Sequence, residues 1–239
     1  MKKFITMVAV ACLISGSVAL GDWVQPPSWD IIDSNFGDGA GEVSIYDAFP
    51  THYYSSGTAT ESLSENLTTV THAAAATWAW KNDITLTGNS FTFEVRFRQP
   101  YGHRTGFTVY GPDGTTAELD FKNPGDGSFD NLSDDASNNV NLTVDRSVMN
   151  SYRTVYDSAS DTLSTYLNGS GTAAGVINSP AKSSNTSTAW VNMADWHAGQ
   201  FFEAEYFKVA NGAWIPEPST TLALLVLGGL TLARRRRSA

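Results

Sequence analysis

Two short stretches of the chain place carboxylates two positions apart, Glu118-Leu119-Asp120 and Glu203-Ala204-Glu205. Alternate residues of a β-strand point to the same face of a sheet, so either stretch would present two carboxylates side by side if it forms a strand. A proton donor beside a nucleophile is the arrangement that hydrolyses a glycosidic bond. The alternative interpretation of both stretches is the solvated polar face of an ordinary strand.

Aromatic side chains next to amides and acids indicate a second kind of chemistry, the binding of sugars. An aromatic ring stacks on the apolar face of a pyranose, and neighbouring polar groups bind its hydroxyls. The residues expected to bind a ligand are Tyr101, His103, Arg104, Trp190, Asn192, Asp195, Trp196 and His197, with Tyr53 and Tyr54 as further candidates. The alternative is that these rings belong to the hydrophobic core.

One segment gathers enough oxygen ligands to bind calcium. Asp126, Asp130, Asp134 and Asp135 lie close together in the sequence, with Asn123 and Asn131 nearby. Hard oxygen ligands on a loop suit Ca²⁺, although the spacing is not that of an EF-hand. An acidic, exposed loop without a metal is the alternative. The histidines show no zinc-binding spacing, and the sequence has neither a G-x-S-x-G nucleophile elbow nor a phosphate-binding loop.

The N-terminus, residues 1–21, is typical of a secretory signal peptide that forms a short helix. Two lysines precede an apolar run from Phe4 to Ile14, and small residues follow. The small residues predict cleavage by signal peptidase after Ala19 or after Gly21. The only cysteine, Cys12, lies in this segment. The mature chain therefore has no disulfide, no thiolate metal site and no cysteine nucleophile.

The C-terminus carries three features in order. Pro216, Glu217 and Pro218 come first, an uncharged run of 14 residues follows from Thr220 to Ala233, and Arg234, Arg235, Arg236 and Arg237 come next. A helix over the uncharged run would be about 21 Å long. The hydrocarbon core of a bilayer is about 30 Å thick, so the run would make a short membrane span. The arginines would stay on the cytoplasmic side of the inner membrane.

Together these features resemble the PEP-CTERM sorting signal, here residues 215–239 with a transmembrane helix at about 220–233. The resemblance implies an exported bacterial protein that is anchored in the membrane until an exosortase, a membrane-embedded transpeptidase, removes the tail near the Pro-Glu-Pro motif. It also implies delivery to the cell surface or to the extracellular polysaccharide matrix. The alternative interpretation of the tail is an ordinary membrane anchor.

Removal of both ends leaves a strongly acidic domain. The whole chain has 15 Lys and Arg, 24 Asp and Glu, and a formal charge of −9. Two of the basic residues lie in the signal peptide and four in the tail, whereas Glu217 is the one acid that is lost. Residues 22–216 therefore carry nine basic and 23 acidic residues, a net charge of −14. Such a surface excludes a simple nucleic-acid binder and disfavours anionic partners.

Residues 22–214 are expected to form a single all-β domain. In Ser90–Arg98 apolar and polar residues alternate, which predicts a strand with one buried and one polar face. Tyr152–Tyr156 and Thr162–Leu167 flank a turn and predict a hairpin. Similar patterns predict strands at 106–110, 116–122, 140–144 and 200–209. Many short strands with turns between them favour a two-sheet antiparallel sandwich of the jelly-roll type.

The order of these strands resembles the concanavalin A-like, or laminin-G-like, sandwich. The resemblance rests on residues 90–97, on 151–169 and on the closing strand 205–209. It implies a structural calcium ion in many members. Catalytic members carry E-x-D-x-x-E on one strand. In this chain Asn123 takes the third position after Glu118, and Lys208 takes it after Glu203, which puts glycosidase activity in doubt.

The sequence therefore predicts an exported, non-enzymatic protein that binds carbohydrate, with an extracellular polysaccharide as its partner. A glycoside hydrolase that uses Glu118 and Asp120 is one alternative. A purely structural matrix protein without a specific ligand is the other. Calcium is the one cofactor that the residues support.

Overall fold

The computed structural model describes residues 23, 25–54, 59–72, 76–101, 104–122, 130–134, 138–195 and 201–216. These residues form a short helix, α2 (Ile45–Ala48), and a series of strands. The strands are β1 (Ile32–Asn35), β2 (Thr51–Tyr54), β3 (Ala59–Ser64), β4 (Leu67–His72), β5 (Ala76–Asp83), β6 (Phe91–Tyr101), β7 (Arg104–Tyr110), β8 (Thr116–Lys122), β9 (Asp130–Ser133), β10 (Asn139–Leu142), β11 (Asn150–Asp157), β12 (Thr162–Leu167), β13 (Ala173–Asn178), β14 (Thr188–Asp195) and β15 (Phe201–Asn211).

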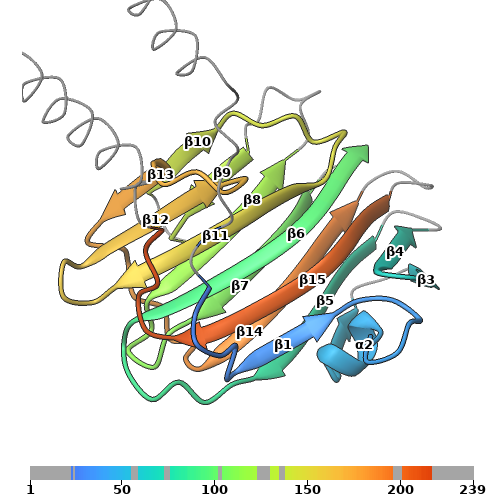
Figure 1. The fold of residues 1–239 in the computed structure, drawn as a ribbon, viewed down its shortest axis with the longest axis horizontal. Helices are drawn as coiled ribbons and strands as arrows, with labels where there is room; N and C mark the ends of the chain where they lie inside the picture. Colours follow the sequence, from blue (N-terminus) through green and yellow to red (C-terminus); the bar gives the residue numbers. More distant parts are fainter. Residues whose placement is uncertain are drawn as a thin grey trace, which may run out of the picture.

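The strands make two sheets that pack face to face (Figure 1). The front sheet has the order β13-β12-β11-β6-β15-β4-β3, and β1 also pairs with β15. The back sheet has the order β10-β9-β8-β7-β14-β5-β2. The pairings within both sheets are antiparallel, for example β6 with β15 and β7 with β8. This architecture confirms the predicted all-β, two-sheet antiparallel sandwich.

Alternating apolar residues of both sheets fill the space between them. On β6, Phe91, Phe93 and Phe97 are at most 1% exposed, as the alternation predicts. The ring of Phe97 lies 4.7 Å from that of Phe107 and 4.5 Å from that of Phe121, and both of these residues belong to the back sheet. Burial of this aromatic surface is the main force that holds the two sheets together.

A third layer covers part of the outer face of the front sheet. It consists of an N-terminal strap (Trp23 and residues 25–30) and a C-terminal segment (residues 212–216), which lie over β6, β11 and β12. Trp23 packs on Val155 and Tyr166 in a small apolar cluster separate from the main core. Part of a face that the sequence pattern marks as polar is therefore enclosed by the two ends of the described domain.

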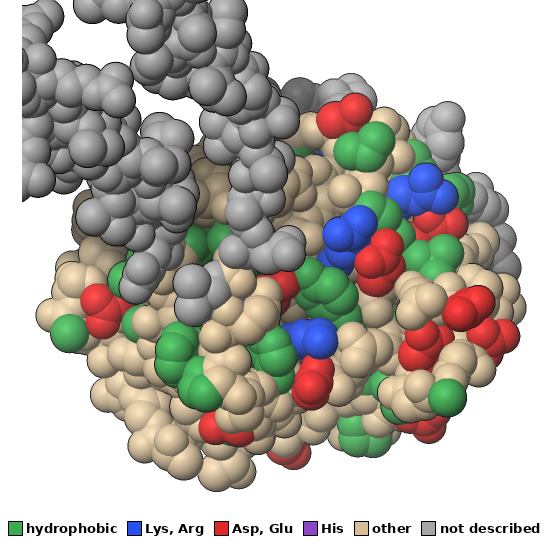
Figure 2. All heavy atoms as spheres, in the orientation of Figure 1, with side chains coloured by type: hydrophobic (Ala, Val, Ile, Leu, Met, Phe, Trp, Pro, Cys, Tyr) green, Lys and Arg blue, Asp and Glu red, His purple; other side chains and the backbone are tan. Residues whose placement is uncertain are grey.

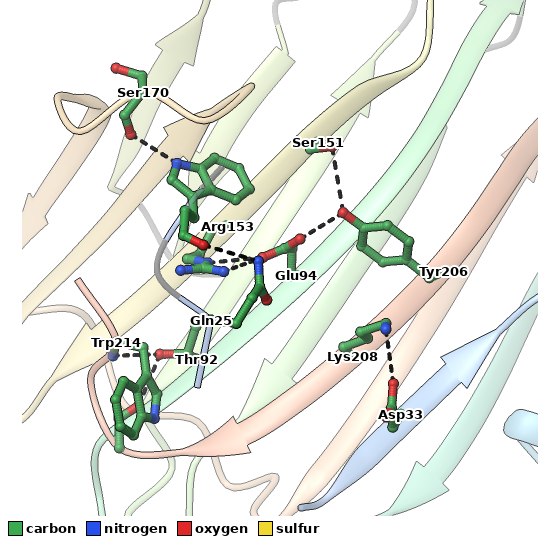
Figure 3. Close-up of polar contacts among 12 residues, drawn as sticks. Gln25, Asp33, Thr92, Glu94, Ser151, Arg153, Ser170, Tyr206, Lys208 and Trp214 are labelled. Atoms are coloured by element: carbon green, nitrogen blue, oxygen red, sulfur yellow. Dashed lines mark hydrogen bonds and ion pairs between the residues drawn. The ribbon is translucent and has the colours of Figure 1, made fainter. Parts of the chain in front are cut away.

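The enclosed face holds a buried ion pair (Figure 3). Glu94 on β6 and Arg153 on β11 are 4% and 0% exposed. Glu94 Oε2 accepts hydrogen bonds from Arg153 Nε at 2.9 Å and from Nη2 at 2.7 Å. The guanidinium lies 4.9 Å from the ring of Trp23 and 5.8 Å from that of Trp29. The Tyr206 hydroxyl donates to Glu94 Oε1 at 2.6 Å, and burial together with the Glu94 charge raises the pKa of this hydroxyl.

No helix in the part of the chain that the structure describes is long and apolar enough to cross a membrane. The expected signal helix in residues 1–21 and the expected sorting helix at 220–233 lie outside the described residues.

Arg153→Met should lower the free energy of unfolding by about 3–5 kcal/mol, because it leaves a buried carboxylate without its cation. Lys81→Met is the matched control. Lys81 pairs with Asp83 at 2.7 Å, but the Asp83 side chain is 77% exposed, and loss of an exposed pair costs at most about 1 kcal/mol. Urea unfolding of both variants measures the difference. An equal loss of unfolding free energy in the two variants would show that the buried ion pair contributes no more stability than an exposed pair.

Candidate functional site

The outer face of the back sheet collects polar side chains in two rows. On β8, Leu119 and Phe121 face the core, so Glu118 and Asp120 face outward. On each of the other strands of this sheet, the cross-strand register places one residue in line with Glu118 and one in line with Asp120. The first row is Thr51, Lys81, Trp190, Thr108, Glu118, Ser133 and Asn139, and the second is Tyr53, Ala79, Asn192, Gly106, Asp120, Asn131 and Asn141.

The middle of both rows is buried. Glu118 and Asp120 are 5% and 2% exposed, and their neighbours Thr108 and Asn131 are 1% and 5% exposed. The interpretation of Glu118 and Asp120 as a solvated polar face is therefore wrong. Both carboxylates take part in further polar interactions.

Two buried polar atoms beside these carboxylates lack a partner. Among the described residues, neither Thr108 Oγ1 nor Asn131 Oδ1 has a hydrogen-bond partner. An unsatisfied buried polar group costs about 1–3 kcal/mol, so such groups are rare unless they serve a purpose. Thr108 lies opposite Glu118, and Asn131 lies opposite Asp120. The two unpartnered groups thus flank the carboxylates on both sides.

Gly106, in the second row, leaves a notch on the outer face of the back sheet. Gly106 lies between Asn192 and Asp120 in the second row. A Cβ at this position would lie 3.3 Å from Glu118 Oε1 and 3.7 Å from Asn192 Nδ2. Because Gly106 has no side chain, Glu118 and Asn192 reach toward each other at the centre of the sheet face.

An aromatic pair lies at the other end of the rows. The rings of Tyr53 and Trp190 stack with centroids 5.3 Å apart and an interplanar angle of 24°, and Tyr53 is 49% exposed. The Trp190 indole N–H donates to Thr188 Oγ1 at 3.0 Å, which fixes the ring. Lys81 Nζ lies 5.7 Å from the centre of the Trp190 ring. The pair forms an accessible platform of the type on which sugar rings stack.

The structure brings five of the predicted site residues to one face, namely Glu118, Asp120, Trp190, Asn192 and the further candidate Tyr53. Tyr101, Arg104 and Asp195 lie in β6, β7 and β14, but their side chains are not described. His103, Trp196 and His197 lie outside the described residues.

The second acidic pair, Glu203 and Glu205, lies on the front sheet. Glu205 Oε2 pairs with Arg96 Nε at 2.8 Å, and Glu203 pairs with Arg98. Each carboxylate is therefore bound to a guanidinium on the neighbouring strand β6. The structure assigns this pair a role in strand pairing, remote from the rows on the back sheet.

Of the four predicted calcium ligands, the structure describes the side chain of Asp134. Its Oδ1 accepts from the Asn138 N–H at 3.1 Å, and its Oδ2 accepts from Asn138 Nδ2 at 2.6 Å and from the Ala181 N–H at 2.9 Å. This carboxylate joins two loops. The side chain of Asp130 is not described, and Asp126 and Asp135 lie outside the described residues. Within the described part, no three metal-ligating side chains cluster, and calcium binding stays a prediction.

Residues 215–237 match the PEP-CTERM protein-sorting motif. The predicted sorting motif, Pro216, Glu217 and Pro218 followed by Arg234 to Arg237, falls within this match. The motif implies an exported protein that an exosortase processes and that is membrane-anchored before processing. A comparison with curated proteins gives no match.

Solved structures with the same fold act on or recognise carbohydrates, according to their names. A sialidase is similar with a TM-score of 0.54 and 10% identity over 76% of this chain, which spans 18% of the sialidase. A carbohydrate esterase from the Shiga toxin-encoding bacteriophage phi24B has a TM-score of 0.51 and 12% identity, covering 76% of this chain and 98% of the esterase. The carbohydrate recognition domain of Emp46p has a TM-score of 0.50 and 12% identity, covering 80% of this chain and 100% of the Emp46p domain. The domain thus has the fold of a lectin-like, concanavalin A-like sandwich, and the chain carries a PEP-CTERM sorting motif.

Thr108→Val should raise the free energy of unfolding by up to about 1 kcal/mol, because it replaces a buried hydroxyl without a partner by a methyl group. Thr154→Val is the matched control, since the equally buried Thr154 hydroxyl bonds to that of Thr165 at 2.9 Å. The free energy of unfolding of this control variant should fall by about 1–3 kcal/mol. Thermal or urea unfolding measures both. A comparable loss in the Thr108 variant would show that its hydroxyl has a partner after all.

Proposed function

We propose that this protein is an exported, non-enzymatic carbohydrate-binding protein, and that its glycan lies across the outer face of the back sheet. The observation that carries the proposal is the buried, unpartnered pair Thr108 Oγ1 and Asn131 Oδ1 beside Glu118 and Asp120. Because the two atoms lie on β7 and β9, on either side of β8, separate glycan hydroxyls would bond to each of them.

The dimensions of the face favour an extended ligand. From Tyr53 on β2 to Asn131 on β9 the rows cross five strand spacings, or about 24 Å. That length accommodates several sugar residues. The aromatic platform would hold the apolar face of a terminal sugar, while the amides and carboxylates would bind hydroxyl groups further along. The net charge of −14 on residues 22–216 favours a neutral polysaccharide over an anionic one.

The neighbours and the sorting motif support the same function. The carbohydrate recognition domain of Emp46p has this fold. A protein that exosortase processes is exported, and outside the cell it meets polysaccharide. The proposed partner is the extracellular polysaccharide of the producing cell. After removal of the tail, the protein would be held at the cell surface or in the matrix by this binding.

Retention of residues 22–216 on immobilised polysaccharides, with and without calcium, tests the proposal. Saturable binding of a neutral polysaccharide is the expected result, and a requirement for calcium would direct attention to the loop from Asp126 to Asp135. No saturable binding under either condition would contradict the proposal and favour a purely structural matrix protein.

Gly106→Ala should weaken glycan binding about tenfold, equivalent to about 1.4 kcal/mol, because the added methyl group displaces Glu118 and fills the notch. Gly88→Ala is the matched control, since a Cβ at Gly88 meets nothing within 4 Å. Isothermal titration with the retained glycan compares the two variants. Unchanged affinity in the Gly106 variant, with its fold intact by circular dichroism, would place the ligand elsewhere on the domain.

A glycoside hydrolase is the second candidate, because Glu118 and Asp120 lie on one buried sheet face. On this alternative Glu118→Gln should abolish hydrolysis, since the amide can neither donate a catalytic proton nor act as a nucleophile. Glu203→Gln on the front sheet is the control and should keep full activity. Reducing-end assays across a polysaccharide panel measure both. Absence of hydrolysis in the unaltered protein would leave the non-enzymatic function.

A further inference from the structure

The two ends of the folded domain meet on the outer face of the front sheet. Trp23, the first residue that the structure describes, belongs to an apolar cluster against which Ala213 packs. Its indole N–H donates to the Ser170 carbonyl at 2.9 Å. Ala213 precedes Pro216, the first residue of the Pro-Glu-Pro motif, by three positions. The chain therefore enters and leaves the domain on the same face, opposite to the proposed glycan-binding face.

The path of the C-terminal segment is fixed by the front sheet (Figure 3). The Thr92 hydroxyl on β6 donates to the Gly212 carbonyl at 2.9 Å and accepts from the Trp214 N–H at 2.9 Å. The Trp214 indole donates to the Asn211 carbonyl at 2.8 Å. Gly212 has a φ of +89°, which a residue with a side chain rarely adopts. Pro216 is buried, so the chain stays attached up to the sorting motif.

The tether between this attachment and the expected membrane helix is short. Residues 217–219 separate Pro216 from Thr220, where the expected helix begins. Three extended residues span about 10 Å, and the ring of Pro218 restricts them further. The PEP-CTERM motif implies that the protein is membrane-anchored before processing. A domain on so short a tether holds the face from which the tail leaves next to the bilayer.

The charges of the front face suit this position. Arg96 pairs with Glu205 at 2.8 Å, Lys208 pairs with Asp33 at 2.9 Å, and Arg98 pairs with Glu203. Figure 2 shows basic and acidic side chains next to one another on this face. Each pair is neutral, so the excess of acidic residues in the domain lies away from these pairs. At these three pairs, the face meets anionic lipids without the repulsion that unpaired carboxylates would cause.

We propose that the outer face of the front sheet is the membrane-proximal face of the anchored precursor, and that the outer face of the back sheet points away from the bilayer. Given the proposed function, on which this step rests, the precursor holds polysaccharide while it is still anchored. Exosortase then acts at the face opposite to the bound glycan.

Lipid quenching of the anchored precursor tests the orientation. Asp33→Cys places a thiol on the front face, and Asn141→Cys places one on the outer face of the back sheet. Both positions are exposed, and the mature chain has no other cysteine. Each precursor, without its signal peptide and with its tail, is labelled with a fluorophore and reconstituted in vesicles that carry nitroxide-labelled headgroups. Quenching at position 33 should be several-fold stronger than at position 141.

Two further samples make the result decisive. Thr69→Cys, opposite Glu203 in the front sheet, repeats the measurement with all three ion pairs intact and should also be quenched. The labelled fragment 22–216, which lacks the tail, should be quenched at neither face. Equal quenching at both faces, stronger quenching at position 141, or no quenching in vesicles that retain the precursor would overturn the orientation. Because no glycan takes part, failure of glycan binding refutes the proposed function and leaves this result unchanged.

Discussion

The ion pair between Glu94 and Arg153 lies on the face of the front sheet that would otherwise meet water. A guanidinium and a carboxylate removed from water are tolerated only when their hydrogen bonds are met and their surroundings are well packed. Tyr206 and the rings of Trp23 and Trp29 provide these partners. The strap and the C-terminal segment lie on the front face, so neither of them covers the outer face of the back sheet.

Much of the fold can be predicted from local patterns, because a strand with one face on a core repeats every two residues. Ser90–Arg98 and the hairpin formed by β11 and β12 show this repeat clearly, and the structure confirms both. The strand β14 cannot be predicted in this way. Its inward residues Ala189, Val191 and Met193 are apolar. The outward Trp190 is apolar as well, so residues 189–191 form a continuous apolar run and the alternation is lost.

The candidate site is predictable only in part, for a different physical reason. The spacing of Glu118 and Asp120 identifies a shared face within one strand. Thr108 and Asn131 are residue types of no distinctive chemistry, and their importance depends on the register that places them opposite those acids. That register is set by pairing between separate strands, and β14 joins β7 to β5 across a long stretch of sequence. The burial of these groups is likewise a property of the assembled sheet.

The strap is held to the sandwich by ring packing and hydrogen bonds without a disulfide, because the sequence has one cysteine, Cys12, and no second one to pair with it. Chain ends with few contacts open at a lower free energy than central strands. When the strap lifts, it uncovers Glu94 and Arg153, whereas the aromatic layer between the sheets stays closed. At high local concentration, the partly opened molecule thus shows its neighbours a hydrated ion pair and the small apolar patch of Val155 and Tyr166. The large aromatic core stays covered, which limits aggregation.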